Sequence, residues 1–184
     1  MTATPWNRRR GLASRLAAMA AAAAVLAFGG LDASAHNVSN WKSGTRGGNM
    51  NEFATWRGTL LGVAVGWAPW NSWSSMLSYF SGTNPKSLKA KHPNVSIAVG
   101  LFPTGGSLSA CAAGQYDANF RTIGSRLASS GVGDAEIRLG WEPGSTDRPW
   151  HAVNRPADQW RACFVSAAKA LKSKGPSLRT DPPR

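Results

Sequence analysis

A basic and an acidic side chain stand four residues apart at the end of a short apolar run. Arg138 and Glu142 share one face of an extended strand, about 13 Å apart along it, while Trp141 would point to the other face if no bulge intervenes. An inward-facing charge near the end of a strand is more typical of a site than of a core. A carboxyl group can protonate the oxygen that leaves when a glycosidic bond breaks. Glu142 is therefore a candidate acid for sugar chemistry.

Aromatic residues close the other apolar runs. Trp67 and Trp70 follow the first run, Phe102 ends the second, and Trp141 stands beside Glu142 in the third. Sugars offer apolar C–H faces to aromatic rings, so an acid among indoles is typical of a saccharide site. The alternative is that Glu142 begins an ordinary polar loop and pairs with a nearby arginine.

Strand and helix patterns alternate along the chain. Short apolar runs predict strands at 60–67, 95–102 and 135–141, and apolar stripes at helical spacing predict helices at 71–80, 116–127 and 156–171. The loop at 103–115 has room for another short element, and 178–184 starts as a strand does before its prolines. Every connection is long enough for a crossover, which favours an α/β fold with a parallel sheet. In such folds the chemistry lies at the carboxyl ends of the strands.

The N-terminus has the parts of an export signal. Arginines at 8, 9, 10 and 15 precede an apolar run at 16–28, and Ala33-Ser34-Ala35 gives a small-x-small cleavage pattern. A membrane anchor would need about 20 apolar residues, and this run is shorter. We therefore expect a signal peptide at 1–35, an irregular segment at 36–57 and the folded part at 58–184. The mature protein would be secreted and free of the membrane.

Charge and cysteine content bound the partners. The chain carries a formal net charge of +12, yet its basic residues are scattered except for Lys86, Lys89 and Lys91. A solvated surface is the favoured interpretation, and no nucleic-acid partner is expected. Cys111 and Cys163 suggest one disulfide in an oxidising compartment, with two buried thiols as the alternative. No Cys/His cluster indicates a metal site, and no cofactor is predicted.

The segment 137–142 (IRLGWE), followed by 148–150 (RPW), resembles the IRLxxE…NGxWYPW segment of glycoside hydrolase family 26. The stretches VGWAPW at 65–70 and YDANFRTIGSRLASSG at 116–131 also fit the relatives of that family. Its best-known members are β-mannanases, which are (β/α)8 barrels that cleave β-linked polysaccharides with retention by two glutamates. The resemblance implies that Glu142 is the general acid/base on the fourth strand. It also implies that Trp150 lines the sugar cleft.

The chain departs from this family in three positions and in length. Trp141 replaces a histidine, 143–145 replaces an Asn-Gly pair, and Arg148 replaces a tyrosine. A complete barrel takes about 250 residues, and the family's nucleophile would lie beyond residue 184. Glu136 is about 20 Å from Glu142 along the same strand, too far for retaining chemistry.

The sequence therefore predicts the N-terminal half of a truncated (β/α)8 TIM barrel with parallel strands. This hydrolase-like protein would act on mannan-type polysaccharide and be inactive alone. Its substrate contacts would come from Trp67, Trp70, Trp141, Trp150 and Arg138.

Two other functions stay open. One is a non-catalytic carbohydrate-binding protein in which exposed tryptophans stack on a polysaccharide. The other is a basic wall-associated or nucleic-acid-binding protein, which is less favoured because no tract interleaves basic and aromatic residues.

Overall fold

The computed structural model describes residues 44–45 and 50–181. The expected signal peptide at 1–35 lies outside these residues. Within the described part, no helix has the length and apolar character that crossing a membrane requires.

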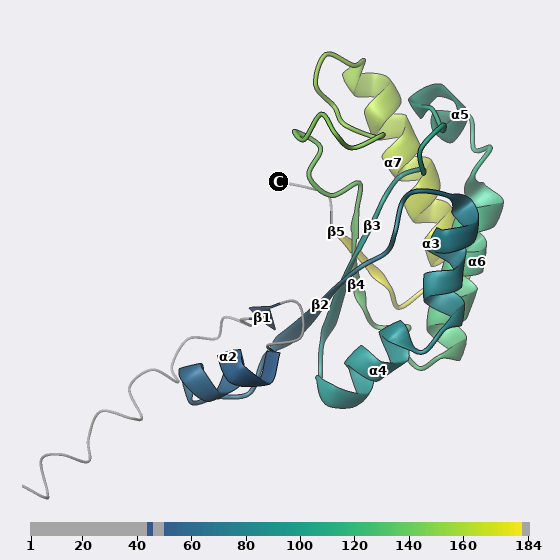
Figure 1. The fold of residues 1–184 in the computed structure, drawn as a ribbon. Coiled ribbons are helices and arrows are strands. Elements are labelled where there is room, and N and C mark those ends of the chain that lie inside the picture. The colour runs from purple at the N-terminus through teal and green to yellow at the C-terminus, as the bar shows by residue number, and fades with distance from the viewer. Residues whose placement is uncertain (1–43, 46–49, 182–184) are drawn as a thin grey trace, which may run out of the picture. The chain divides into compact units, whose positions relative to one another are not determined.

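Parallel strands form one sheet in which each strand pairs with the next along the chain (Figure 1). The strands of the described residues are β1 (Gly44–Thr45), β2 (Val63–Trp67), β3 (Val95–Val99), β4 (Glu136–Leu139) and β5 (Arg179–Asp181). All four pairings are parallel. A doubly wound sheet reverses its strand order part-way, and this sheet does not. The predicted α/β class with a parallel sheet is confirmed, and the sequential order is compatible with part of a barrel.

Helices connect the strands. They are α2 (Met50–Arg57), α3 (Trp73–Ser81), α4 (Asn84–Lys91), α5 (Leu108–Ala112), α6 (Asp117–Ser129) and α7 (Ala157–Lys172). Helix α6 packs against α3 and α7, and α5 packs against α7. Together α3, α6 and α7 form a layer along one face of the sheet (Figure 1). We call this the helix layer.

The core lies between the sheet and the helix layer. Phe120, Ile123 and Leu127 form the predicted stripe of α6 and are fully buried. Ile97 and Ile137 pair in register on adjacent strands and are equally buried. Alternate strand residues project to the other face, where the register aligns Trp67, Ala98, Arg138 and Asp181 in one row. This second face, the Trp67 face, leads to the strand-end site.

Two helices were not predicted. Helix α2 lies in the segment expected to be irregular, together with strand β1, so that expectation is wrong. Helix α4 is the second, and its one buried residue is Pro85. Helix α2 buries no residue, and Trp56 within it is 79% exposed. A helix that buries so little needs no apolar residues at helical spacing, and that spacing is what allows a helix to be predicted from sequence.

The loop after β3 contains the short element for which the sequence left room. This is α5, in which Cys111 forms a disulfide with Cys163 of α7, as predicted. A helix of five residues is too short to be stable alone. The disulfide therefore holds α5 against the helix layer.

Candidate strand-end site

Glu142 follows β4, the fourth strand of the described sheet, at its carboxyl end. Strand β4 ends at Leu139, and the chain then turns at Gly140, which has a φ of +65°. A Cβ atom at Gly140 would lie 3.0 Å from Trp160 and 3.1 Å from Leu101, so the space favours glycine as well. The φ of Glu142 is also positive, at 50°. These two turns set the direction in which the carboxylate leaves the sheet.

The turn at Gly140 brings Trp141 to the Trp67 face. The rings of Trp141 and Trp67 meet edge to face with centroids 6.2 Å apart. Trp70 lies 5.5 Å from Trp141 in a similar arrangement. Trp141 is expected on the other face only if no bulge intervenes. The left-handed residue Gly140 does interrupt the alternation of the strand, so Trp141 lies on the Trp67 face.

Arg148 joins the acidic and aromatic parts of the site. Its Nη2 atom donates to Glu142 Oε2 at 2.9 Å, and its Nη1 atom donates to Asp147 Oδ2 at 2.7 Å. The guanidinium carbon lies 4.6 Å from the ring centroid of Trp70 and 4.4 Å from that of Trp141. The side chain is 16% exposed, so these cation–π contacts are largely shielded from water. We call Arg148 with these four partners the Arg148 cluster.

No functional role was predicted for Arg148 from the sequence, in which it stands where the resembling family has a tyrosine. The signal that could have found it is its position between two acidic residues and a Pro-Trp pair in one loop. Its ion pair with Glu142 is also the contact that the ordinary-loop alternative predicts.

Arg138 lies beside this cluster on the Trp67 face. Its guanidinium carbon is 5.2 Å from the centroid of the Trp67 ring. The Nε and Nη2 atoms are buried and have no hydrogen-bond partner within the described part of the chain. Buried donors without partners cost free energy. Because these two atoms are inaccessible, a ligand could contact Arg138 only through its remaining nitrogen, Nη1.

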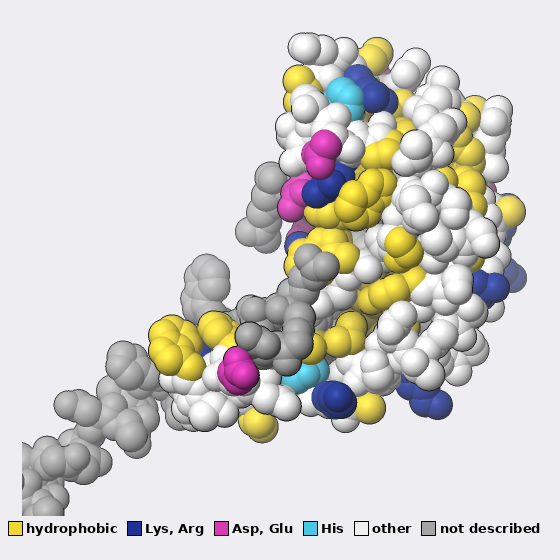
Figure 2. Space-filling model, in the orientation of Figure 1, with side chains coloured by type: hydrophobic (Ala, Val, Ile, Leu, Met, Phe, Trp, Pro, Cys, Tyr) yellow, Lys and Arg dark blue, Asp and Glu magenta, His cyan; other side chains and the backbone are white. Residues whose placement is uncertain are grey.

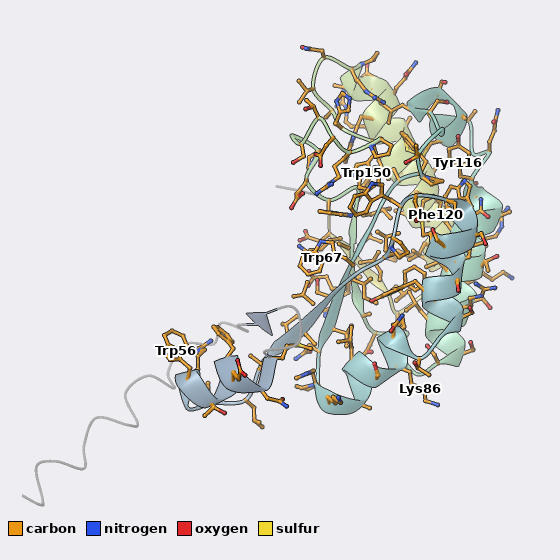
Figure 3. The ribbon with its side chains drawn as sticks, viewed as in Figure 1. Trp56, Trp67, Lys86, Tyr116, Phe120 and Trp150 are labelled. Atoms are coloured by element: carbon orange, nitrogen blue, oxygen red, sulfur yellow. A yellow bond between two sulfur atoms is a disulfide. The ribbon has the colours of Figure 1, made fainter. Side chains whose placement is uncertain are left out.

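Trp150 does not line a cleft. It is fully buried, and its Nε1 atom donates to the carbonyl oxygen of Trp141 at 2.8 Å (Figure 3). Its ring fills the space above Gly100, where a Cβ atom would come within 2.3 Å of it. The predicted substrate contact is therefore wrong, and Trp150 instead supports the loop that carries Glu142. Trp141 is 6% exposed and faces Arg148, which leaves Trp67 and Trp70 as the half-buried indoles of the site.

Two of the other carboxylates near the site are already engaged, and a third, Asp181, lies in the same row as Arg138. Glu136 accepts a hydrogen bond from Ser96 Oγ at 3.3 Å, at the amino-terminal end of β4. Asp147 shares Arg148 with Glu142. Within the described residues, no three His, Cys, Asp or Glu side chains form a group that could hold a metal ion. The site thus offers one half-exposed carboxylate, two arginines and two half-buried indoles.

A separate cavity of 410 Å³ opens at the amino-terminal end of the strands. Lys89 and Asp134 line it and form an ion pair at 2.6 Å. The hydrogen bond from Lys89 lowers the pKa of Asp134, against a smaller opposing effect of burial. Parallel α/β sheets bind ligands at the opposite end, so we place the candidate site at the strand ends.

Comparisons with known proteins add no family to this geometry. No family model matches the chain, and no curated protein matches it.

Proposed function

We propose that this exported protein binds a β-linked polysaccharide of the mannan type at the strand-end site, as a relative of family 26 glycoside hydrolases. The observation that carries the proposal is the position of Glu142, directly after the fourth strand of a sequentially ordered parallel sheet. In the family that the sequence resembles, the acid/base residue follows the fourth strand. The indoles that lie beside it suit the apolar faces of sugar rings.

Trp67 and Arg138 supply complementary binding groups. Trp67 offers a half-buried ring, and Arg138 lies beside it with its guanidinium carbon 5.2 Å from the ring centroid. A pyranose unit presents both a C–H face and hydroxyl acceptors, so one sugar could engage both side chains.

We infer binding without turnover. Retaining hydrolysis needs two carboxylates about 5 Å apart, one as nucleophile and the other as proton donor. The acid that shares the loop of Glu142 is Asp147, and both bind the same guanidinium. Asp181 instead pairs in register with Arg138 on the neighbouring strand. Arg148 therefore engages one of the two oxygens of Glu142 and holds Asp147 through the same guanidinium.

The alternative function is a carbohydrate-binding protein that never was an enzyme and that holds the polysaccharide on exposed tryptophan rings. It requires exposed rings, and among the described tryptophans Trp56 alone is largely exposed, on α2. The ion pair of Glu142 with Arg148 favours a protein that binds without catalysis. The indoles pack against one another, which favours a short binding site over an extended surface of stacking rings.

Titration calorimetry with mannohexaose tests the proposal. Loss of ring stacking in Trp67→Ala should weaken binding about tenfold. The matched control is Trp56→Ala, which removes an indole far more exposed than Trp67 and should leave the affinity unchanged. Wild-type protein that does not bind mannohexaose, or two variants with equal affinity, would refute the proposal.

A reducing-sugar assay on β-mannan tests the lack of turnover. We expect no release above background from the wild-type chain or from Glu142→Gln. Turnover that Glu142→Gln abolishes would show a working acid/base residue and contradict this part of the proposal.

A further inference from the structure

A basic groove lies on the helix layer, away from the strand-end site. It has a volume of 380 Å³ and is lined by Ala118, Arg121, Thr122, Ser125 and Arg126 of α6 and by Lys174 after α7. Three of these six side chains are cationic, none is acidic and none is aromatic. We call this the α6 groove.

Close packing of two helices creates the groove. A Cβ atom at Gly124 of α6 would lie 2.2 Å from the carbonyl oxygen of Leu171 at the end of α7. The glycine therefore lets the end of α7 approach α6 as no larger residue would. This approach brings Lys174 beside the α6 face that carries Arg121 and Arg126.

The cations of the groove are only weakly neutralised. Arg126 Nη1 donates to the carbonyl oxygen of Leu77 at 2.6 Å, which orients the guanidinium without cancelling its charge. Arg121 has a long 4.0 Å contact with Asp117 and is 47% exposed. Lys174 is exposed, and the Ser125 hydroxyl has no hydrogen bond to any residue that the structure describes. An oriented guanidinium loses less entropy when it binds a ligand.

Charge is distributed unevenly over the described residues. The last turn of α7 adds Lys169 and Lys172 to the basic side of the molecule. Of the acids, Glu142 and Asp147 lie at the strand ends, whereas Asp117 and Asp158 lie in the first turns of α6 and α7. Figure 2 shows Lys and Arg side chains along the margin of the helix layer, and also beside the acidic side chains near the strand ends.

We propose that the α6 groove binds the phosphate groups of a poly(alditol phosphate), and so holds the exported protein on an anionic polymer. Guanidinium groups form paired hydrogen bonds with phosphate oxygens, and a lysine and a hydroxyl add further donors. A nucleic acid fits less well, because no aromatic side chain lines the groove to stack on bases. The strand-end site stays accessible in this arrangement, since it lies on other elements.

The test measures binding of the full chain to immobilised poly(glycerol phosphate) at increasing salt. The groove variant is Arg121→Glu with Lys174→Glu. The control is Lys86→Glu with Arg161→Glu, which makes the same change in net charge at exposed cations outside the groove. Circular dichroism verifies that both variants fold.

We expect the groove variant to lose at least tenfold in affinity at about 0.1 M salt, and the control less than threefold. The slope of log K against log salt should fall by roughly one per lost phosphate contact. Equal losses in the two variants would show that net charge alone acts and would overturn the proposal. Absence of binding, or tighter binding to single-stranded DNA or polyuronate, would also overturn it. Mannohexaose binding, measured in parallel, should be the same in the groove variant and the wild type.

Discussion

At the scale of single residues, Arg148 organises the strand ends. Its guanidinium binds the carboxylates of Glu142 and Asp147 and covers faces of Trp70 and Trp141. An arginine can do this because its planar group donates along its edges and stacks on its faces. Lysine has a single charged point and cannot make both kinds of contact at once.

We predict that Arg148→Met lowers the free energy of unfolding by about 1–2 kcal/mol, because two shielded cation–π contacts are lost and two carboxylates lose their shared partner. Arg148→Lys should recover less than half of this. Urea unfolding followed by tryptophan fluorescence gives the values. Arg161→Met is the control, since that side chain is 72% exposed, and it should change stability by less than about 0.5 kcal/mol. Equal stabilities of Arg148→Met and the wild type would contradict the prediction that the contacts of the Arg148 cluster stabilise the fold.

Gly100 is predicted to tolerate no side chain. A Cβ atom there would lie 2.3 Å, 2.7 Å and 2.8 Å from three atoms of the buried Trp150 ring. Gly100→Ala should therefore cost about 1–3 kcal/mol through overpacking. Thermal unfolding measures the loss, and Gly144→Ala is the control because its Cβ would meet nothing within 4 Å. A melting temperature for Gly100→Ala equal to that of Gly144→Ala would show that Trp150 can move aside.

The sequence located Glu142 and several of its neighbours, but neither the part played by Arg148 nor the burial of Trp150. Spacing and apolar runs placed Glu142 after a strand, and the structure agrees. The side to which Trp141 points, the burial of Trp150 and the ion pair of Arg148 could not be predicted. Each depends on a turn at Gly140 or on contacts between segments around residues 70, 100 and 150 that meet only in the fold.

At the scale of elements, amphipathic helices were predictable and surface helices were not. Helices α6 and α7 bury regular stripes, such as Phe120, Ile123 and Leu127, which the apolar periodicity shows. Helix α4 lies on the surface and has a lysine-rich sequence, so its residues show no apolar repeat at helical spacing. It packs on the sheet through Leu88 and Pro85, and the ion pair of Lys89 with Asp134 links it to the loop before β4.

This contact predicts a pH dependence of stability. The hydrogen bond from Lys89 lowers the pKa of Asp134 below the ordinary value of an aspartate. The stabilisation is therefore present above the unfolded-state pKa and is lost as the pH falls through the lower pKa of the folded state. The Asp134 side chain is 62% exposed, so screening by water limits the effect to less than about 1 kcal/mol.

The pH-dependent stabilisation is measured by urea unfolding at about pH 6 and about pH 2.5. The proteins compared are the wild type, Asp134→Asn, Lys89→Met and the double variant. The two single variants should each lose the same acid-sensitive part, and the double variant should lose no more. Additive losses would show that the two side chains act independently.

At the scale of the whole molecule, the sequential order of the strands places β3 at the centre. It has two described strands on each side, and all five of its residues are buried. Helix α2 is the opposite case, since it buries none of its residues. Local opening requires little free energy where few apolar contacts break, and approaches global unfolding where many break.

Amide hydrogen exchange should therefore be graded across the described residues. We expect α2 to exchange within minutes, β5 at the sheet edge to be intermediate, and β3 and α6 to exchange only through global opening. The gradient follows from burial: three residues of β5 are exposed or half-buried, whereas Ile97 of β3 and Phe120 of α6 are fully buried. Mass spectrometry of exchanged peptides gives these rates. Protection of α2 as strong as that of α6 would mean that α2 has a packing partner beyond its described contacts, and would contradict a fold whose stability comes from the sheet centre and the helix layer.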